Sequence, residues 1–158
     1  MEKITYQFED FLQSVVPEFQ EFAAGIHVSM MAAGCKIKIE SKASGFFVSY
    51  ANPKTKRSLL NFLFRKKGLI VRMYPGDIGR CAALLDRLPD GMVKELDKAQ
   101  ICKRLTQTAD CSSRCVMGYD FLARGNRYQI CRYCLQFAVT PESAPVLAEW
   151  AALELEEA

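Results

Sequence analysis

The chain has 158 residues, of which 50% are hydrophobic and 25% are charged, and its formal net charge at pH 7 is +3. This length and composition favour one globular domain over residues 1–158, and we expect no second independent domain. No apolar run approaches the roughly 18 to 20 residues of a membrane-spanning helix, and residues 1–5 lack the basic-then-apolar order of a secretory signal. We therefore predict a cytoplasmic protein without a membrane partner.

Two helices are predicted at the N-terminus. Residues 6–14 place Phe8 and Phe11 at helical spacing, and Pro17 suits the first turn of a second helix. In this second segment apolar side chains recur every three or four residues up to about Ala33. Gly34 then follows as a typical C-terminal stop.

The pattern changes to that of strands after this stop. Residues 35–40 alternate strictly between apolar and polar side chains, which predicts a half-buried strand. Three more strands are predicted over residues 46–51, 57–65 and 69–74, with a tight hairpin whose Gly68 takes the position that needs positive φ. Four consecutive strands indicate an α+β fold, with an antiparallel sheet of four to five strands and helices packed on one face.

The C-terminal half mixes helices with a cysteine-bearing subregion, residues 100–137. Within it, residues 103–127 are polar and have no clear pattern. The elements predicted around it are a helix over 77–88 capped by Asp77, a helix from Pro89 or Asp90 to about Lys98, a strand over 128–139 and a helix over 141–157.

Seven cysteines are an odd number, so at least one thiol lies outside any intramolecular disulfide. Because no export signal places the chain in an oxidising compartment, reduced thiols or metal ligands are favoured over a disulfide framework. Cys35 and Cys81 have apolar surroundings and are interpreted as small buried side chains. The remaining five are two close pairs separated by 15 residues and one preceding cysteine: Cys111 and Cys115, Cys131 and Cys134, and Cys102.

Two such pairs can enclose Zn²⁺ in a tetrahedral shell of thiolates, and their spacing is near the zinc-ribbon pattern. We expect a metal site that uses at least three of the five cysteines, with zinc as the first choice of metal and iron as the second. Cys102 is able to replace one ligand. A closed shell leaves no position for substrate, so the role of the metal would be structural. The alternative is that these cysteines are reduced and simply pack around an irregular segment.

Positive charge is concentrated in residues 36–74, which contain seven Lys and three Arg against the single acid Glu40. Clustered cations beside aromatic side chains such as Phe47 and Tyr50 would suit nucleic acid. The alternative is that strand ends carry cations to prevent edge-to-edge association while the aromatics are core. The candidate nucleic-acid-binding residues are Lys54, Lys56, Arg57, Arg65, Lys66, Lys67 and Arg72.

Residues 8–88 contain a recognisable order of predicted elements. Two helices come first, and then strands through Lys56–Leu60 and Lys66–Pro75, and then another helix. This order resembles the DUF1801 or YdhG-like family of small α/β proteins. Some members of that family look like iron chaperones of the frataxin type, which would imply acidic or cysteine metal ligands. The strands here are basic where such a surface would be acidic. The segment after Ala99 lies outside the resemblance, which therefore implies no functional residue.

Three functions remain open at this point. The first is a non-enzymatic binding or regulatory protein with a structural metal site, whose partner is a protein or an anionic ligand held by arginines near the cysteines. The second is nucleic-acid binding through the basic block at residues 54–72. The third is a small enzyme of unknown reaction, which no carboxylate pair, Ser-His-Asp set or phosphate loop in the sequence supports.

Overall fold

The computed structural model describes residues 5–106 and 118–156 of the chain. It begins with α1 (Phe8–Ser14) and α2 (Pro17–Ala32), close to the two predicted helices. The Asp10 carboxylate accepts a hydrogen bond of 2.8 Å from the Gln7 amide, which satisfies a backbone donor at the start of α1. Gly34 follows α2 with φ of +81°, a conformation that glycine adopts without steric cost, and so ends the helix as predicted.

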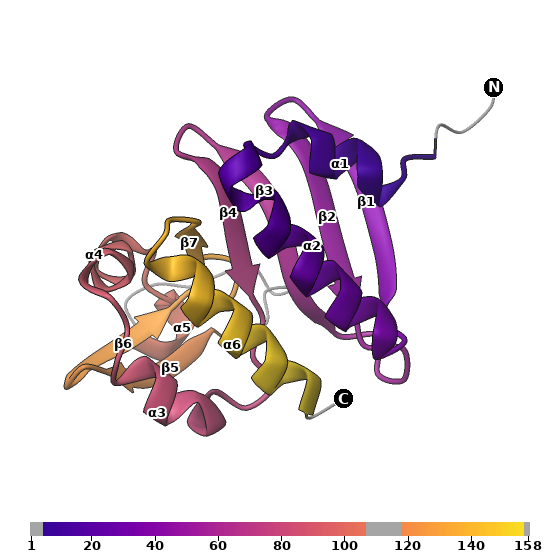
Figure 1. Cartoon of the computed structure of the whole chain (residues 1–158). Coiled ribbons are helices and arrows are strands. Elements are labelled where there is room, and N and C mark those ends of the chain that lie inside the picture. The colour runs from indigo at the N-terminus through magenta and orange to yellow at the C-terminus, as the bar shows by residue number, and fades with distance from the viewer. Residues whose placement is uncertain (1–4, 107–117, 157–158) are drawn as a thin grey trace.

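Five strands form an antiparallel sheet in the order β1-β2-β3-β4-β7, and α1 and α2 cover one of its faces (Figure 1). The predicted α+β fold is therefore confirmed. Arg65 pairs with Gly68 across a two-residue turn, and Gly68 has the expected positive φ of +101°. The strands are β1 (Lys36–Lys42), β2 (Gly45–Ala51), β3 (Ser58–Arg65), β4 (Gly68–Met73) and β7 (Gln136–Ala138).

Two predictions for the C-terminal half are wrong. The helix expected over 77–88 is broken into a 3-10 helix, η1 (Ile78–Cys81), and one turn of α-helix, α3 (Ala82–Leu85). The strand expected over 128–139 is two strands, because the Cys134 amide donates to the Cys131 carbonyl at 2.9 Å and closes a turn between them. The remaining elements are α4 (Asp90–Lys98), α5 (Lys103–Thr106), a separate two-stranded sheet of β5 (Tyr119–Ala123) and β6 (Asn126–Ile130), and α6 (Ser143–Glu156).

The main hydrophobic core lies between the sheet and the helices α1, α2 and α6, and it continues to α3, α4 and the two-stranded sheet. Phe11 stacks on Phe62 of β3 with ring centroids 5.2 Å apart, and Trp150 of α6 packs against Phe137 of β7. One continuous cluster of buried side chains therefore joins the N-terminal helix to the C-terminal helix. Within the described residues, no helix is both long and apolar enough to span a lipid bilayer.

The opposite side of the sheet, here called the rear face, has a smaller apolar patch of Leu63, Ile70 and Ala138. Side chains alternate between the two faces along a strand, so Asn61 and Arg72 share the rear face with this patch. The rear face is thus apolar in the middle and polar toward the turn between β2 and β3.

Glu154 of α6 is buried, with only 2% of its surface exposed, and it joins three parts of the chain. Its carboxylate accepts hydrogen bonds from the Gly76 amide at 3.0 Å and from the Cys81 thiol at 3.7 Å. The Arg57 guanidinium lies 3.9 Å away and supplies positive charge. Glu154 therefore ties α6 to the segment after β4 and to the start of β3.

Candidate basic groove

The predicted cysteine cluster is only partly within the described residues. Cys111 and Cys115 lie outside them. Cys131 and Cys134 lie at the two ends of one turn, where their side chains interact, and both are half-buried. Burial raises the pKa of the Cys134 thiol, and the neighbouring Cys131 raises it further. This turn connects two strands and opens no helix, so it lacks the helix N-terminus that lowers a thiol pKa in redox pairs.

Cys102 takes part in backbone pairing with β6. Its amide donates to the Gln129 carbonyl at 2.8 Å, and its sulfur accepts a hydrogen bond from the Gly118 amide at 3.3 Å. The side chain is 5% exposed. Over residues 5–106 and 118–156, no three His, Cys, Asp or Glu side chains converge as a metal site would require. Cys35 and Cys81 are buried, as predicted.

The predicted basic block is divided between the two ends of β3. Lys54, Lys56 and Arg57 lie in the turn before this strand, whereas Arg65, Lys66 and Lys67 lie at its other end. Eight residues of strand separate these ends by about 25 Å, at roughly 3.3 Å for each residue. The seven candidate residues therefore do not form a single cluster.

The end of the block near the β2–β3 turn is largely structural. The Asn52 side chain accepts hydrogen bonds from the amides of Lys54 and Thr55, and the Arg57 guanidinium donates to the Tyr74 carbonyl. The expected stacking platform is also not formed by Tyr50, which is fully buried in the core. Its hydroxyl lies 2.8 Å from Nδ1 of His27, whose pKa is lowered by burial.

The other end of the block forms one wall of a groove of about 420 Å³. The opposite wall is the C-terminal end of α4, which lies beside β7 (Figure 1). Helix α4 is amphipathic and buries Met92 and Leu96. Lys98, at the end of this helix, lines the groove. This basic groove is lined by Arg65, Lys66, Lys67, Ile70, Glu95, Lys98, Ala99, Gln100, Cys134 and Gln136.

The groove carries an excess of positive charge. Arg65, Lys66, Lys67 and Lys98 are exposed, and none of them forms a salt bridge with another described residue. Glu95 is the one acid among the described residues that line the groove. Four cations against one carboxylate give a positive field that is strengthened by the low-dielectric wall of the sheet.

Glu95 forms hydrogen bonds with the backbone of β7. Both of its carboxylate oxygens accept the Ala138 amide, at 2.9 and 3.2 Å, which caps the outer edge of this strand. Burial raises the pKa of Glu95, while the Ala138 amide, Lys67 and Lys98 oppose that shift. The arrangement protects a sheet edge, because both carboxylate oxygens of Glu95 accept from a backbone amide there.

Arg72 lies at the margin of the groove, and its hydrogen-bond partners among the described residues are neutral. Its Nε and Nη2 atoms donate to Oε1 of Gln136 at 3.2 and 3.0 Å, and Nη1 lies 3.5 Å from the Tyr74 hydroxyl. No carboxylate of the described residues forms a salt bridge with it. Its charge acts on Cys134, whose pKa it lowers against the larger effect of burial. The guanidinium is therefore held in place with its charge available to an anion.

Sequence reasoning identified the hairpin cations and Arg72 but missed Lys98, Gln100 and Gln136. The prediction of a helix ending at about Lys98 was sound, yet no local pattern indicates that this helix packs against the edge of β7. Comparison with family models, with curated proteins and with solved structures finds no match to this chain. The resemblance of residues 8–88 to the DUF1801 family therefore stays a prediction.

Proposed function

We propose that the chain is a cytoplasmic, non-enzymatic binding protein that takes a phosphate-bearing anion in the basic groove. The observation that carries this proposal is a set of four cations around one hollow that form no salt bridge within the described part of the chain, with Arg72 held beside it by Gln136. Lys and Arg side chains are the usual partners of phosphate oxygens, and a volume of about 420 Å³ is in the range of small-ligand sites.

Nucleic acid is one source of such a phosphate, and a free mononucleotide is another. The basic block is split between the two ends of β3. This favours a nucleic acid that contacts the hairpin over a short length, and not one that contacts all seven candidate residues. We expect a single-stranded oligonucleotide to bind with an affinity that falls steeply as salt rises, because each neutralised phosphate releases a counterion. If a mononucleotide binds, with an affinity that depends less on salt than that of the oligonucleotide, the ligand is the free mononucleotide.

Reversing charge in the groove is expected to weaken this binding by on the order of 30-fold for Lys66→Glu with Lys67→Glu, and to reduce the salt slope by about one for each lost phosphate contact. Fluorescence anisotropy with a labelled oligonucleotide, repeated with a mononucleotide as competitor, measures both quantities. The groove wall is an exposed hairpin, so these changes should leave the fold intact.

The matched control is Lys36→Glu with Lys94→Glu, which changes the net charge equally at exposed positions outside the groove lining and outside the basic block. This variant should retain most of the affinity. Equal weakening in the two double variants would show that only overall charge matters. That result, or the absence of any phosphate ligand that binds, would reject the groove as a site.

A structural metal site is a second proposal, supported by the interacting thiols of Cys131 and Cys134. Two thiolates at the ends of a tight turn can share one ion at about 2.3 Å, which is half of a tetrahedral zinc shell. In this proposal the remaining ligands come from Cys111 and Cys115, which lie outside the described residues. Zinc stays the first choice and iron the second.

Protein purified without chelator is expected to contain close to one equivalent of zinc or iron by elemental analysis. Cys131→Ser and Cys134→Ser should each lower that content, whereas Cys35→Ala should not, because the Cys35 sulfur contacts Met30 in the main core. Less than about a tenth of an equivalent in the unchanged protein would leave the cysteines as reduced, packed thiols.

A further inference from the structure

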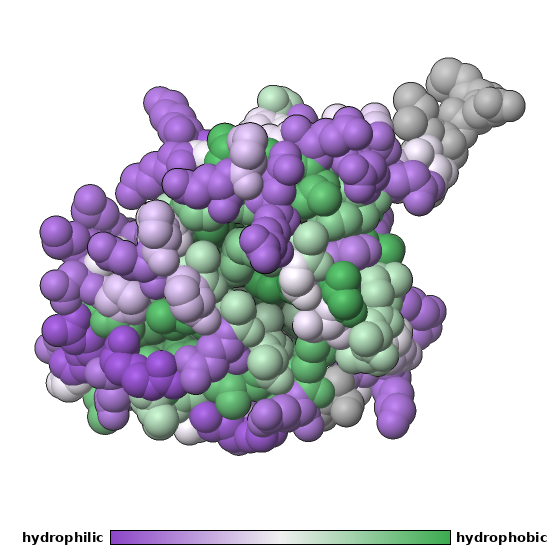
Figure 2. Space-filling model, viewed as in Figure 1, coloured by the Kyte–Doolittle hydropathy of each residue, from purple (hydrophilic) through white to green (hydrophobic). Residues whose placement is uncertain are grey.

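A long apolar groove runs between α2 and α6 on the side of the molecule that faces the viewer in Figure 2. It consists of two hollows of about 470 and 500 Å³ that share Glu21, Phe22 and Ala148. Green surface follows the two helices in Figure 2, and purple residues surround it. The floor is made of half-buried rings and small side chains: Phe19, Phe22, Gly25, Ser29, Ala144, Ala148 and Ala152.

Helix α6 is unusually apolar for a helix at the surface. Its only charged residues are Glu149, Glu154 and Glu156, and Glu154 is buried. Exposed positions on the groove side are occupied by Ala148 and Ala152. A helix with apolar residues on its outer side as well as its inner side is normally covered on both. The sheet covers the inner side of α6, which leaves the groove side for a partner.

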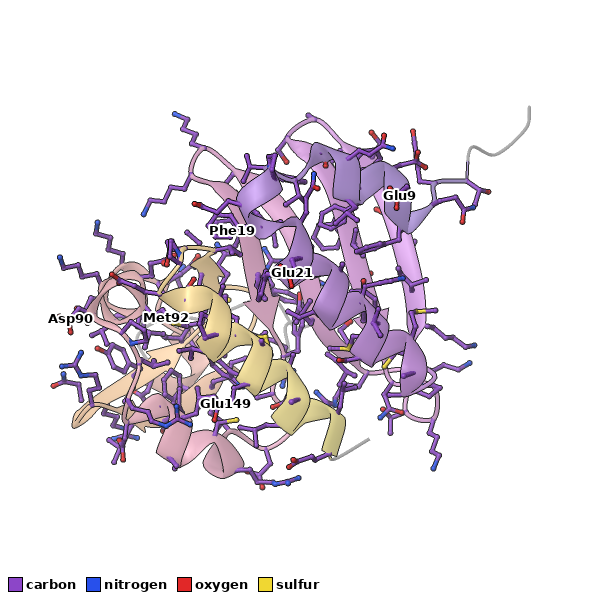
Figure 3. The ribbon with its side chains drawn as sticks, viewed as in Figure 1. Glu9, Phe19, Glu21, Asp90, Met92 and Glu149 are labelled. Atoms are coloured by element: carbon purple, nitrogen blue, oxygen red, sulfur yellow. The ribbon has the colours of Figure 1, made fainter. Side chains whose placement is uncertain are left out.

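The groove has a strictly acidic rim. Neither α2 nor α6 contains a Lys or Arg residue, and the charged residues in the lining are Glu18, Glu21 and Glu156. Glu156 pairs with Arg80 at 3.7 Å, whereas Glu18 and Glu21 form no salt bridge with a described residue. Figure 3 shows Phe19 and Glu21 close together along α2. Along α2, an apolar floor therefore lies beside two carboxylates, Glu18 and Glu21, that form no salt bridge with a described residue.

We propose that this groove binds an amphipathic helix of a partner protein that carries Lys or Arg beside its apolar face. The apolar face would lie between α2 and α6, where small side chains allow a close approach, and the cations would face Glu18 and Glu21. Helix α6 has 14 residues and is about 21 Å long at 1.5 Å for each residue, enough for about four turns of the bound helix.

A second copy of this chain is a poorer occupant on electrostatic grounds. A symmetric pair would place two acidic rims against each other, and like charges at an interface oppose association. A partner with basic residues converts the same rim into an attraction that steers the encounter and weakens as salt rises.

The test uses the full chain and a synthetic amphipathic peptide of about 14 residues, with Leu on one helical face and Lys on the other. We expect binding in the micromolar range by isothermal titration calorimetry, with affinity falling as salt rises. A peptide of the same composition with the leucines scrambled around the helix should bind at least tenfold more weakly, because its apolar side chains cannot enter the groove together.

Two single substitutions locate the contact. Ala148→Lys places a long cation in the region common to both hollows and should weaken peptide binding at least tenfold. Ala83→Lys, at an exposed position on α3, is the matched control and should bind the peptide as the unchanged chain does. Far-ultraviolet circular dichroism and the thermal midpoint check that both variants fold.

Three outcomes would overturn the proposal. One is equal affinity for the ordered and the scrambled peptide, or no binding of either. Another is equal binding by the Ala148→Lys and Ala83→Lys variants. The third is a dimer of the unchanged chain in sedimentation analysis that Ala148→Lys converts to monomer, since this would assign the groove to a second copy.

Discussion

Replacing Gly118 with alanine is expected to lower the free energy of unfolding by about 3 kcal/mol, the upper end of the usual range for overpacking. A Cβ atom at this position would lie 2.1 Å from the Ile130 carbonyl oxygen and 3.0 Å from Cβ of Cys102. The backbone cannot easily yield, because Ile130 pairs with Tyr119 in the two-stranded sheet and with Ile101 in an isolated bridge. The strain therefore falls where the start of β5, the end of β6 and the segment of Ile101 and Cys102 meet.

Urea denaturation followed by circular dichroism measures this loss as a lower midpoint. Gly91→Ala in α4 is the matched control, because its Cβ would meet no atom within 4 Å. There the substitution should leave stability unchanged or raise it by up to about 1 kcal/mol through lower entropy of the unfolded chain. Similar midpoints for the two variants would contradict the close packing at Gly118.

Glu154→Ala is expected to cost about 2 to 3 kcal/mol of unfolding free energy. The substitution leaves the Gly76 amide and the Cys81 thiol without their acceptor and removes the charge that faces Arg57. The cost should stay below that of breaking a fully buried ion pair, since the Arg57 side chain is 32% exposed and 3.9 Å away.

Two further variants test whether the loss of stability comes from the buried contacts of Glu154 or from the loss of any negative charge on α6. Glu154→Gln keeps an acceptor for the Gly76 amide and should recover about half of the loss. Glu156→Ala removes a carboxylate that is 63% exposed on the same helix, and should change stability by no more than about 0.5 kcal/mol. If Glu156→Ala and Glu154→Ala were equally destabilising, the buried contacts of Glu154 would not explain its effect.

Local periodicity predicted most helices and strands to within a few residues. The alternation in residues 35–40 corresponds to β1, and the three- and four-residue spacing after Pro17 corresponds to α2. The two failures share a cause. Residues 77–88 and 128–139 contain enough apolar side chains to resemble one element each, but each is divided by hydrogen bonds that no periodicity reports.

The basic groove was predictable only in part. The hairpin cations follow from the sequence, because a two-residue turn with Gly68 necessarily places Lys66 and Lys67 at its tip. The second wall requires α4 to dock on β7, and that contact joins residues 43 positions apart through Glu95 and Ala138. Sequence reasoning also missed the groove between α2 and α6, since the two helices lie at opposite ends of the chain.

The sequence by itself determined the α+β class, the antiparallel sheet, the position of the basic hairpin and the closeness of Cys131 to Cys134. All of these depend on interactions between residues a few positions apart, where propensity and spacing act directly. Only the tertiary structure decided which cations share a groove, that Glu154 is buried, and that α2 and α6 leave an apolar surface between them. Those features arise from contacts between distant segments, whose partners are selected by the packing of the whole core.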